Sequence, residues 1–284
     1  EVWKNIHVQA DASTRYAFGT VCEKIGVMPP RIIPFYKRPV WRYAAVFALL
    51  VVSVATTYWA TSRYASRETV MAEEYAPMGK IRTIVLPDSS LALLNSDSYI
   101  LYPKNFEGET RTVYLMGEAD FKVRKNLHKP FIVRSGDMAV TALGTEFNVN
   151  FYPEDTKLEA TLLEGKIKVD CGAESYILAP GEQVVYNRLT GVSGRASVNS
   201  ADVTAWQRGE VVFRSCTIAD VLQTLQRRFG VKFQYREDMF NTDKFNFSFR
   251  SDASIGQIMD IMKTVTGKFD YLIDGNTCFL MESK

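Results

Sequence analysis

Residues 43–62 read YAAVFALLVVSVATTYWATS, twenty successive positions without a charged side chain. A helix needs about 20 apolar residues to cross a hydrocarbon core about 30 Å thick. Aromatic rings near both ends of the stretch suit the two membrane interfaces; they are Trp41, Tyr43, Tyr58, Trp59 and Tyr64. We therefore expect a single-pass membrane protein with its transmembrane helix over residues 40–62, rather than the buried helix of a soluble protein.

The charges on either side of this stretch give it a direction. The N-terminal flank is basic, with Arg31, Lys37, Arg38 and Arg42, whereas the C-terminal flank mixes both signs. Because basic flanks stay in the cytoplasm, we expect residues 1–39 to form a cytoplasmic tail and the remainder to be exported. A cleaved signal peptide would have a shorter basic region and a small-residue cleavage site. The chain begins at Glu1 rather than Met, so we expect a truncated tail.

Composition indicates a folded protein that does not bind nucleic acid. The chain has 284 residues, of which 46% are hydrophobic and 23% charged, and its formal net charge is +2. This length accommodates two small domains. The small net charge gives no strong attraction for phosphates, and no basic stripe with interleaved aromatic residues is present.

The sequence offers little for catalysis or metal binding. The four cysteines lack C-x-x-C spacing, so no zinc site is indicated; Cys171, Cys216 and Cys278 fall in the exported part, where one pair could bridge. His128 lies alone between lysines in an expected turn, away from any nucleophile. Glu118 and Asp120 share one face of an expected strand, and a solvated or structural role is the default for such a pair. We expect no cofactor, no metal and no conventional enzyme.

Residues 78–192 have the pattern of an all-β domain. Short apolar or alternating runs are separated by turn residues, without a 3.6-residue stripe. The segment Pro87-Asp88-Ser89-Ser90 predicts a hairpin turn, because proline fixes φ and the polar side chains can bond their own backbone. Turn spacing and a faint internal repeat leave a sandwich and a β-solenoid open. We expect linkers over residues 63–77 and 193–208.

Residues 209–284 predict a small α+β domain of order β-α-β-β-α-β-β. Thr217 with Asp220 and Ser254 with Gln257 each form a capping box ahead of an amphipathic helix, and glycine ends both helices. Strands of period two surround the helices and should form the sheet that the helices cover.

Six short motifs follow one another through the exported part. They are Leu86-Pro87-Asp88-Ser89-Ser90 with Leu94-Asn95; Arg111-x-Val113-x-Leu115-x-Gly117-Glu118-Ala119-x-Phe121-x-Val123; Lys129-Pro130-Phe131-x-Val133; Leu143-Gly144-Thr145-Glu146-Phe147-Asn148-Val149; Leu163-Glu164-Gly165-Lys166; and Leu178-x-Pro180-Gly181. In this order they resemble the FecR-like transmembrane anti-sigma regulators. Residues 209–284 resemble the short N-terminal domain shared by secretins and TonB-dependent transporters, which often follows the FecR-like region.

The resemblance implies a signalling relay across a bacterial envelope. The cytoplasmic tail would hold or release an extracytoplasmic-function (ECF) sigma factor, although most of the usual sigma-binding region is expected to be missing here. The helix would sit in the inner membrane, and both folded domains would lie in the periplasm. There they would receive the signalling domain of an outer-membrane TonB-dependent transporter, with regulated proteolysis as part of the relay.

Two sites follow from these considerations. Some members of the resembled family cut themselves at a Gly-Thr bond, and the matching bond here is Gly144–Thr145. For docking, the last strand is the candidate, because a small sheet leaves an edge open for a partner strand. Its residues are Asn276, Thr277, Cys278, Phe279, Leu280 and Met281. Alternation places Thr277, Phe279 and Met281 opposite Cys278 and Leu280.

The alternative function is a membrane-anchored envelope enzyme or glycan-binding β-solenoid. A glycoside hydrolase would need paired acids in a groove rimmed by aromatic residues. The sequence alone does not assemble such a site, whereas the six motifs favour the signalling protein.

Overall fold

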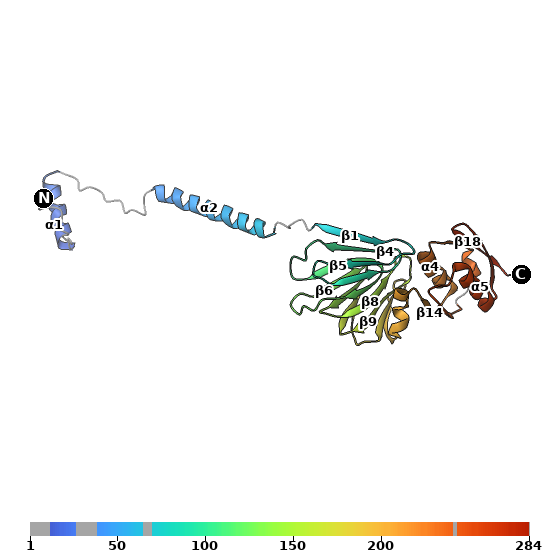
Figure 1. Cartoon of the computed structure of the whole chain (residues 1–284). Coiled ribbons are helices and arrows are strands. Elements are labelled where there is room, and N and C mark those ends of the chain that lie inside the picture. The colour runs from blue at the N-terminus through green and yellow to red at the C-terminus, as the bar shows by residue number, and fades with distance from the viewer. Residues whose placement is uncertain (1–11, 27–38, 65–69, 241–242, 284) are drawn as a thin grey trace. The chain divides into compact units, whose positions relative to one another are not determined.

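The computed structural model describes residues 12–26, 39–64, 70–240 and 243–283. The chain divides into two compact units, Glu1–Arg67 and Glu68–Lys284. The first unit contains helix α1 (Ala12–Lys24) and helix α2 (Pro39–Tyr64) (Figure 1). The helix α1 was not expected, since the tail shows little helical periodicity; the remainder of residues 1–39 is largely outside the described residues.

Helix α2 contains the expected apolar stretch. Within the described residues it is the one helix long and apolar enough to cross a membrane, over Tyr43–Thr61. The hydroxyls of Thr56 and Thr61 donate to the backbone carbonyls of Val52 and Thr57, one turn earlier. Such bonds satisfy polar side chains without water. The expected apolar helix is confirmed. That it crosses a membrane, and in which orientation, stays a prediction.

The second unit begins with a β domain of thirteen strands. They are β1 (Met71–Ala76), β2 (Arg82–Val85), β3 (Leu91–Leu94), β4 (Ser98–Pro103), β5 (Arg111–Lys122), β6 (Phe131–Ser135), β7 (Met138–Ala142), β8 (Glu146–Phe151), β9 (Lys157–Glu164), β10 (Ile167–Cys171), β11 (Glu174–Leu178), β12 (Glu182–Asn187) and β13 (Ser193–Ser197). They form one sheet, folded into two layers and nearly closed into a barrel (Figure 1). All pairings are antiparallel except that between β5 and β6. The all-β expectation is confirmed; a solenoid of stacked parallel coils is not seen among these strands.

Strand β5 joins the two layers. Its first half pairs with β4 and β6, and its second half pairs with β3 and β8. The change of partners occurs at Gly117, where φ is 111° and a Cβ would lie 2.4 Å from the Ser98 hydroxyl oxygen. Only glycine fits this close approach. We call the layer of β1, β4, β6, β7, β10 and β11 layer A, and the layer of β2, β3, β8, β9, β12 and β13 layer B; β5 belongs to both.

The core between the layers is apolar, with one buried ion pair. Phe121 packs against Phe131 and Phe147, with ring centroids 5.8 and 5.4 Å apart. Arg111 is 2% exposed, and its Nη1 lies 2.6 Å from Asp88 Oδ2. Burial disfavours the charged carboxyl, but hydrogen bonds from Ser90 and Arg111 prevail and hold the Asp88 pKa below its usual value.

The turn that contains Asp88 joins β2 to β3, so the predicted hairpin is confirmed. Leu86 donates its backbone N–H to the carbonyl of Ser90, and Ser89 has a φ of 67°.

The C-terminal module has the predicted order of elements. They are β14 (Val211–Cys216), α4 (Ile218–Phe229), β15 (Lys232–Gln234), β16 (Phe245–Phe249), α5 (Ile255–Thr266), β17 (Phe269–Asp274) and β18 (Thr277–Glu282). Both capping boxes are present, and Gly230 and Gly267 end the helices in the left-handed conformation. The strands form two sheets rather than one: β14 pairs with β16, and β18 lies between β15 and β17.

Both expected linkers carry secondary structure. Strand β1 lies within residues 63–77 and pairs with β4 along its whole length. Residues 193–208 contain β13 and the short helices α3 (Ser200–Val203) and η2 (Ala205–Arg208). The sequence MAEEYA of β1 has little β propensity, so pairing with its neighbour decides its conformation.

Candidate functional site

The outer face of layer B is polar where the C-terminal module covers it. Two rows of side chains cross strands β5, β8, β9 and β12 in register: Glu118, Asn150 and Glu159 in one, and Asp120, Asn148, Thr161 and Gln183 in the other. Residues of α3, η2, β14 and α4 complete a cavity of about 550 Å³ above these rows. A polar face enclosed between two domains must satisfy its hydrogen bonds there or hold water.

Glu118 is the central acid of this junction. Each of its carboxyl oxygens accepts one hydrogen bond, Oε2 from Asn95 Nδ2 at 2.7 Å and Oε1 from Asn148 Nδ2 at 2.9 Å. Burial raises its pKa from 4.5 to about 8, and the bond from Asn95 and the charge of Arg227 offset only part of that effect. The Glu118 carboxyl is therefore largely protonated at neutral pH.

Asp120 lies two residues further along β5 and is 7% exposed. Burial, reinforced by the charge of Glu146, raises its pKa to about 7. Its Oδ2 has no hydrogen-bond partner among the described residues. The expectation that the two acids share a face is confirmed; on that face Asp120 is buried and Glu118 is half-buried.

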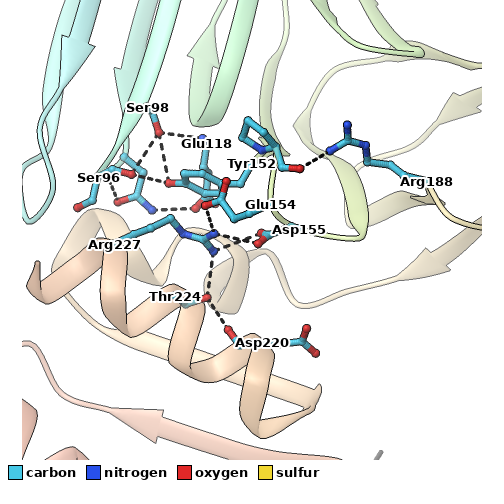
Figure 2. Close-up of polar contacts among 12 residues, drawn as sticks. Ser96, Ser98, Glu118, Tyr152, Glu154, Asp155, Arg188, Asp220, Thr224 and Arg227 are labelled. Carbon is cyan, nitrogen blue, oxygen red and sulfur yellow. Dashed lines mark hydrogen bonds and ion pairs between the residues drawn. The ribbon is translucent and has the colours of Figure 1, made fainter. Parts of the chain in front are cut away.

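Arg227 makes the main polar contact between the C-terminal module and the β domain (Figure 2). It projects from α4, and its side chain is 7% exposed. Its Nη1 lies 2.8 Å from both Glu154 Oε1 and Asp155 Oδ1, and its guanidinium stacks on the ring of Tyr152 at 3.8 Å. Cation, two carboxylates and ring together make a closely fitted contact between the domains.

The same contact continues into the β domain. The hydroxyl of Tyr152 donates to the carbonyl of Ser96 at 2.7 Å, and Ser98 lies 3.3 Å from the same hydroxyl (Figure 2). On the opposite side of the helix end, the backbone N–H of Gly79 donates to the Arg227 carbonyl at 3.0 Å. The end of α4 is thus held by the β1–β2 turn and by the loop between β8 and β9.

The predicted cleavage bond lies elsewhere in the β domain, immediately before β8. Gly144 has a φ of 148°, and Thr145 is 8% exposed. The Thr145 hydroxyl has no hydrogen-bond partner among the described residues. Gly165 packs on this bond, and a Cβ there would lie 2.7 Å from Thr145 Cγ2. A cavity of about 520 Å³ opens beside it.

The predicted docking strand is placed differently from expectation. Residues 277–282 form β18, which pairs with β15 on one side and β17 on the other, so it is not an edge strand. The prediction of an open backbone edge is wrong for residues 277–279, because β15 follows α4 and pairs in parallel with this part of β18. The predicted alternation is confirmed: Cys278 and Leu280 are buried, whereas Phe279 and Met281 are exposed.

Other candidate groups are not assembled into a site. His128 is exposed in the turn before β6, and His7 is outside the described residues. All four cysteines are free. Among the described residues, no group of three or more His, Cys, Asp or Glu side chains could hold a metal ion.

Comparisons with known families match both domains in order. The model described as FecR protein matches residues 73–168, and the model described as FecR, C-terminal matches residues 210–280. The chain belongs to the FecR family. Two crystal structures of a candidate anti-sigma factor from Parabacteroides distasonis are similar to it, each with 27% identity. Their TM-scores are 0.72 and 0.71, and the matches cover 76% and 75% of this chain and all of theirs. No curated protein matches it.

The junction was only partly visible in the sequence of this FecR-family chain. Glu118 and Asp120 stand out as two acids on a strand, but Arg227 does not, because arginines in the last turn of a helix usually face solvent. Its partners Glu154 and Asp155 are more than seventy positions away. A pairing at such a distance leaves no local pattern.

Proposed function

We propose that the chain is a transmembrane anti-sigma regulator that relays a signal from a TonB-dependent transporter to an ECF sigma factor. The presence of both FecR domains in their expected order carries this proposal. The apolar helix α2 provides the membrane anchor, with residues 1–39 in the cytoplasm and the folded domains in the periplasm. The sigma factor binds the N-terminal region, and the transporter's signalling domain docks on the C-terminal module. Regulated proteolysis completes the relay.

The outer face of the three-stranded sheet is the proposed docking surface. Leu272, Phe279 and Met281 are 59%, 36% and 50% exposed. Leu272 and Phe279 are directly opposite each other on β17 and β18, and Met281 is the next outward residue on β18. Large apolar side chains exposed together favour a protein interface. Docking thus uses side chains of the predicted strand instead of its backbone edge.

The junction gives this docking a route to the β domain. The outer sheet and α4 share the module core, and α4 carries Arg227 into the contact with Glu154 and Asp155. A partner that moves the module has one of two effects. It separates Arg227 from Glu154 and Asp155, or it leaves this ion pair intact and moves both domains together. Either response transmits force toward the strand that follows the membrane helix.

Binding measurements test the docking surface. Purified signalling domain should bind the full chain, and Phe279→Ser or Leu272→Ser should weaken binding about tenfold, the effect of a typical interface anchor. Val265→Ser, at a 58% exposed position on α5, is the control. Equal affinity for all variants would place docking elsewhere, and removal of residues 209–284 would then show whether the β domain binds.

Co-purification tests the other end of the relay. A sigma factor should be recovered with the full-length protein, and its absence would contradict the anti-sigma role. Alkaline phosphatase fused after Ser62 or Lys284 should be active, because both positions are assigned to the periplasm. Activity of a cytoplasm-only reporter at Lys284 would reverse the topology.

We also propose self-cleavage between Gly144 and Thr145. The Thr145 hydroxyl oxygen attacks the Gly144 carbonyl carbon, and its proton passes to the departing amide nitrogen; water then hydrolyses the resulting ester to a carboxylate and a free hydroxyl. The buried Thr145 hydroxyl lies beside a glycine carbonyl and has no hydrogen-bond partner in the part of the chain that the structure describes, which supports this chemistry. The parent should yield two fragments and Thr145→Ala one intact band, whereas a single intact band from both would exclude cleavage.

A further inference from the structure

The outer face of layer A carries large apolar side chains that nothing within residues 70–240 and 243–283 covers. Tyr99, Leu101, Tyr114 and Met116 are between 37% and 51% exposed. Tyr99 is directly opposite Met116, and Leu101 is directly opposite Tyr114. Tyr75 on β1 stacks on Tyr99 with ring centroids 4.1 Å apart. A solvated sheet face normally alternates to polar residues at these positions, so this face has the composition of an interface.

Opposite charges flank these residues. Glu73 on β1 lies beside Leu101, and Arg134 on β6 lies beside Tyr114. Across four adjacent strands the row is therefore Glu73, Leu101, Tyr114 and Arg134, with both charged residues exposed. The next charged residue in the row is Asp170, which is paired with Lys168. An acid and a base at the two ends of an apolar row make the row complementary to itself.

We infer that this face binds a second copy of the chain, with a two-fold axis parallel to the strands and between β4 and β5. Rotation about that axis places Glu73 opposite Arg134 of the second copy and Leu101 opposite its Tyr114. Strands are about 4.8 Å apart and packed sheets about 10 Å apart, a gap that an arginine and a glutamate side chain span together. An axis perpendicular to the strands would set Glu73 against itself, so the charges select one arrangement.

The second row of the face agrees with this arrangement. Met116 would lie opposite Tyr99 of the second copy, a favourable contact between a thioether and an aromatic ring. The interface lies on layer A, whereas the C-terminal module covers layer B, so dimerisation and docking use different surfaces. This inference therefore does not depend on the proposed relay.

Co-purification of two differently tagged full-length copies in detergent tests the inference. The parent copies should associate, and Glu73→Arg or Arg134→Glu should each weaken self-association about tenfold. A Glu73→Arg copy mixed with an Arg134→Glu copy should associate at least as well as the parents, because both ion pairs then form again. Lys244→Glu, a charge reversal at an exposed position in the C-terminal module, is the control for the change in net charge that Arg134→Glu makes.

Each result decides the matter. Recovery of association in the mixed pair supports the two-fold arrangement, since a folding defect in either copy would not be repaired by the other. Parent copies that stay monomeric, or association that is insensitive to both reversals, would overturn the inference. It would also be overturned if Tyr114→Ser abolished binding of the transporter's signalling domain while self-association was unchanged, because the face would then belong to a different partner.

Discussion

Replacement of Glu118 by glutamine should stabilise the folded unit Glu68–Lys284, and increasingly so as the pH rises. The folded protein holds the pKa of Glu118 at about 8 against a usual value of 4.5. Between these values the unfolded chain loses the proton and the folded chain retains it, so folding stability falls as pH rises toward 8. Glutamine cannot ionise. Its Oε1 can still accept from Asn95, and its amide N–H can donate to Asn148 once the Asn148 amide turns to present Oδ1, which has no partner among the described residues of the parent.

The magnitude follows from the difference in pKa. At about 1.4 kcal/mol per pH unit, the full difference between the folded and unfolded pKa values would lower the free energy of unfolding by about 5 kcal/mol above pH 8. Glu118 is half-buried and lines a cavity, so dielectric screening weakens that effect. We therefore expect Glu118→Gln to gain about 2–3 kcal/mol over the parent at pH 8 and nearly nothing at pH 5. Urea unfolding of residues 68–284 at several pH values measures this difference.

The control is Glu109→Gln, at an exposed glutamate in the loop before β5. Its stability should follow that of the parent at every pH. If the Glu118→Gln and parent curves ran parallel from pH 5 to 8, the carboxyl would not be retaining a proton in the folded state, and the buried-acid description of the junction would be refuted.

Three further predictions concern contacts within the folded unit. Arg227→Met should destabilise the unit by about 3–5 kcal/mol at pH 7, because it leaves Asp155 beside Glu154 without their buried cation; denaturant unfolding measures the loss. Gly117→Ala should cost about 3 kcal/mol or more by clashing at the bend of β5, and its thermal midpoint should fall accordingly. Asp88→Asn should lose about 3 kcal/mol near neutral pH by the same measurement, and the loss should shrink in acid, since the lowered pKa of Asp88 supplies stability that disappears as its carboxylate is protonated.

Local chemistry made much of the fold predictable. The capping boxes at Thr217 and Ser254 define helix starts by pairs three residues apart, and the structure contains both. The hairpin around Asp88 is likewise set by four consecutive residues. Such features depend on neighbours in the chain, so sequence alone reveals them.

Pairings between distant strands were not predictable in the same way. Alternation identified β18 as a strand with Phe279 facing outward, but it cannot tell which strands lie beside it. The parallel return of β15 gave β18 a second partner and removed the expected edge. Strand β1 shows the converse case, in which a weak local pattern is stabilised by pairing with β4.

The division of labour between the two sheet faces follows from a single strand. Even-numbered residues of β5 point outward along its whole length. Tyr114 and Met116 are exposed on layer A, whereas on layer B Glu118 lines the cavity beneath the C-terminal module and Asp120 is buried. The bend at Gly117 turns the strand between them, so apolar residues meet solvent and acids become buried. This reverses the usual burial of the two residue classes. Such a reversal costs folding stability on both faces. The apolar surface of layer A remains available to a partner, and the acidic junction on layer B opens more readily as its protons leave. Both properties would suit a protein whose domains must change contacts to signal.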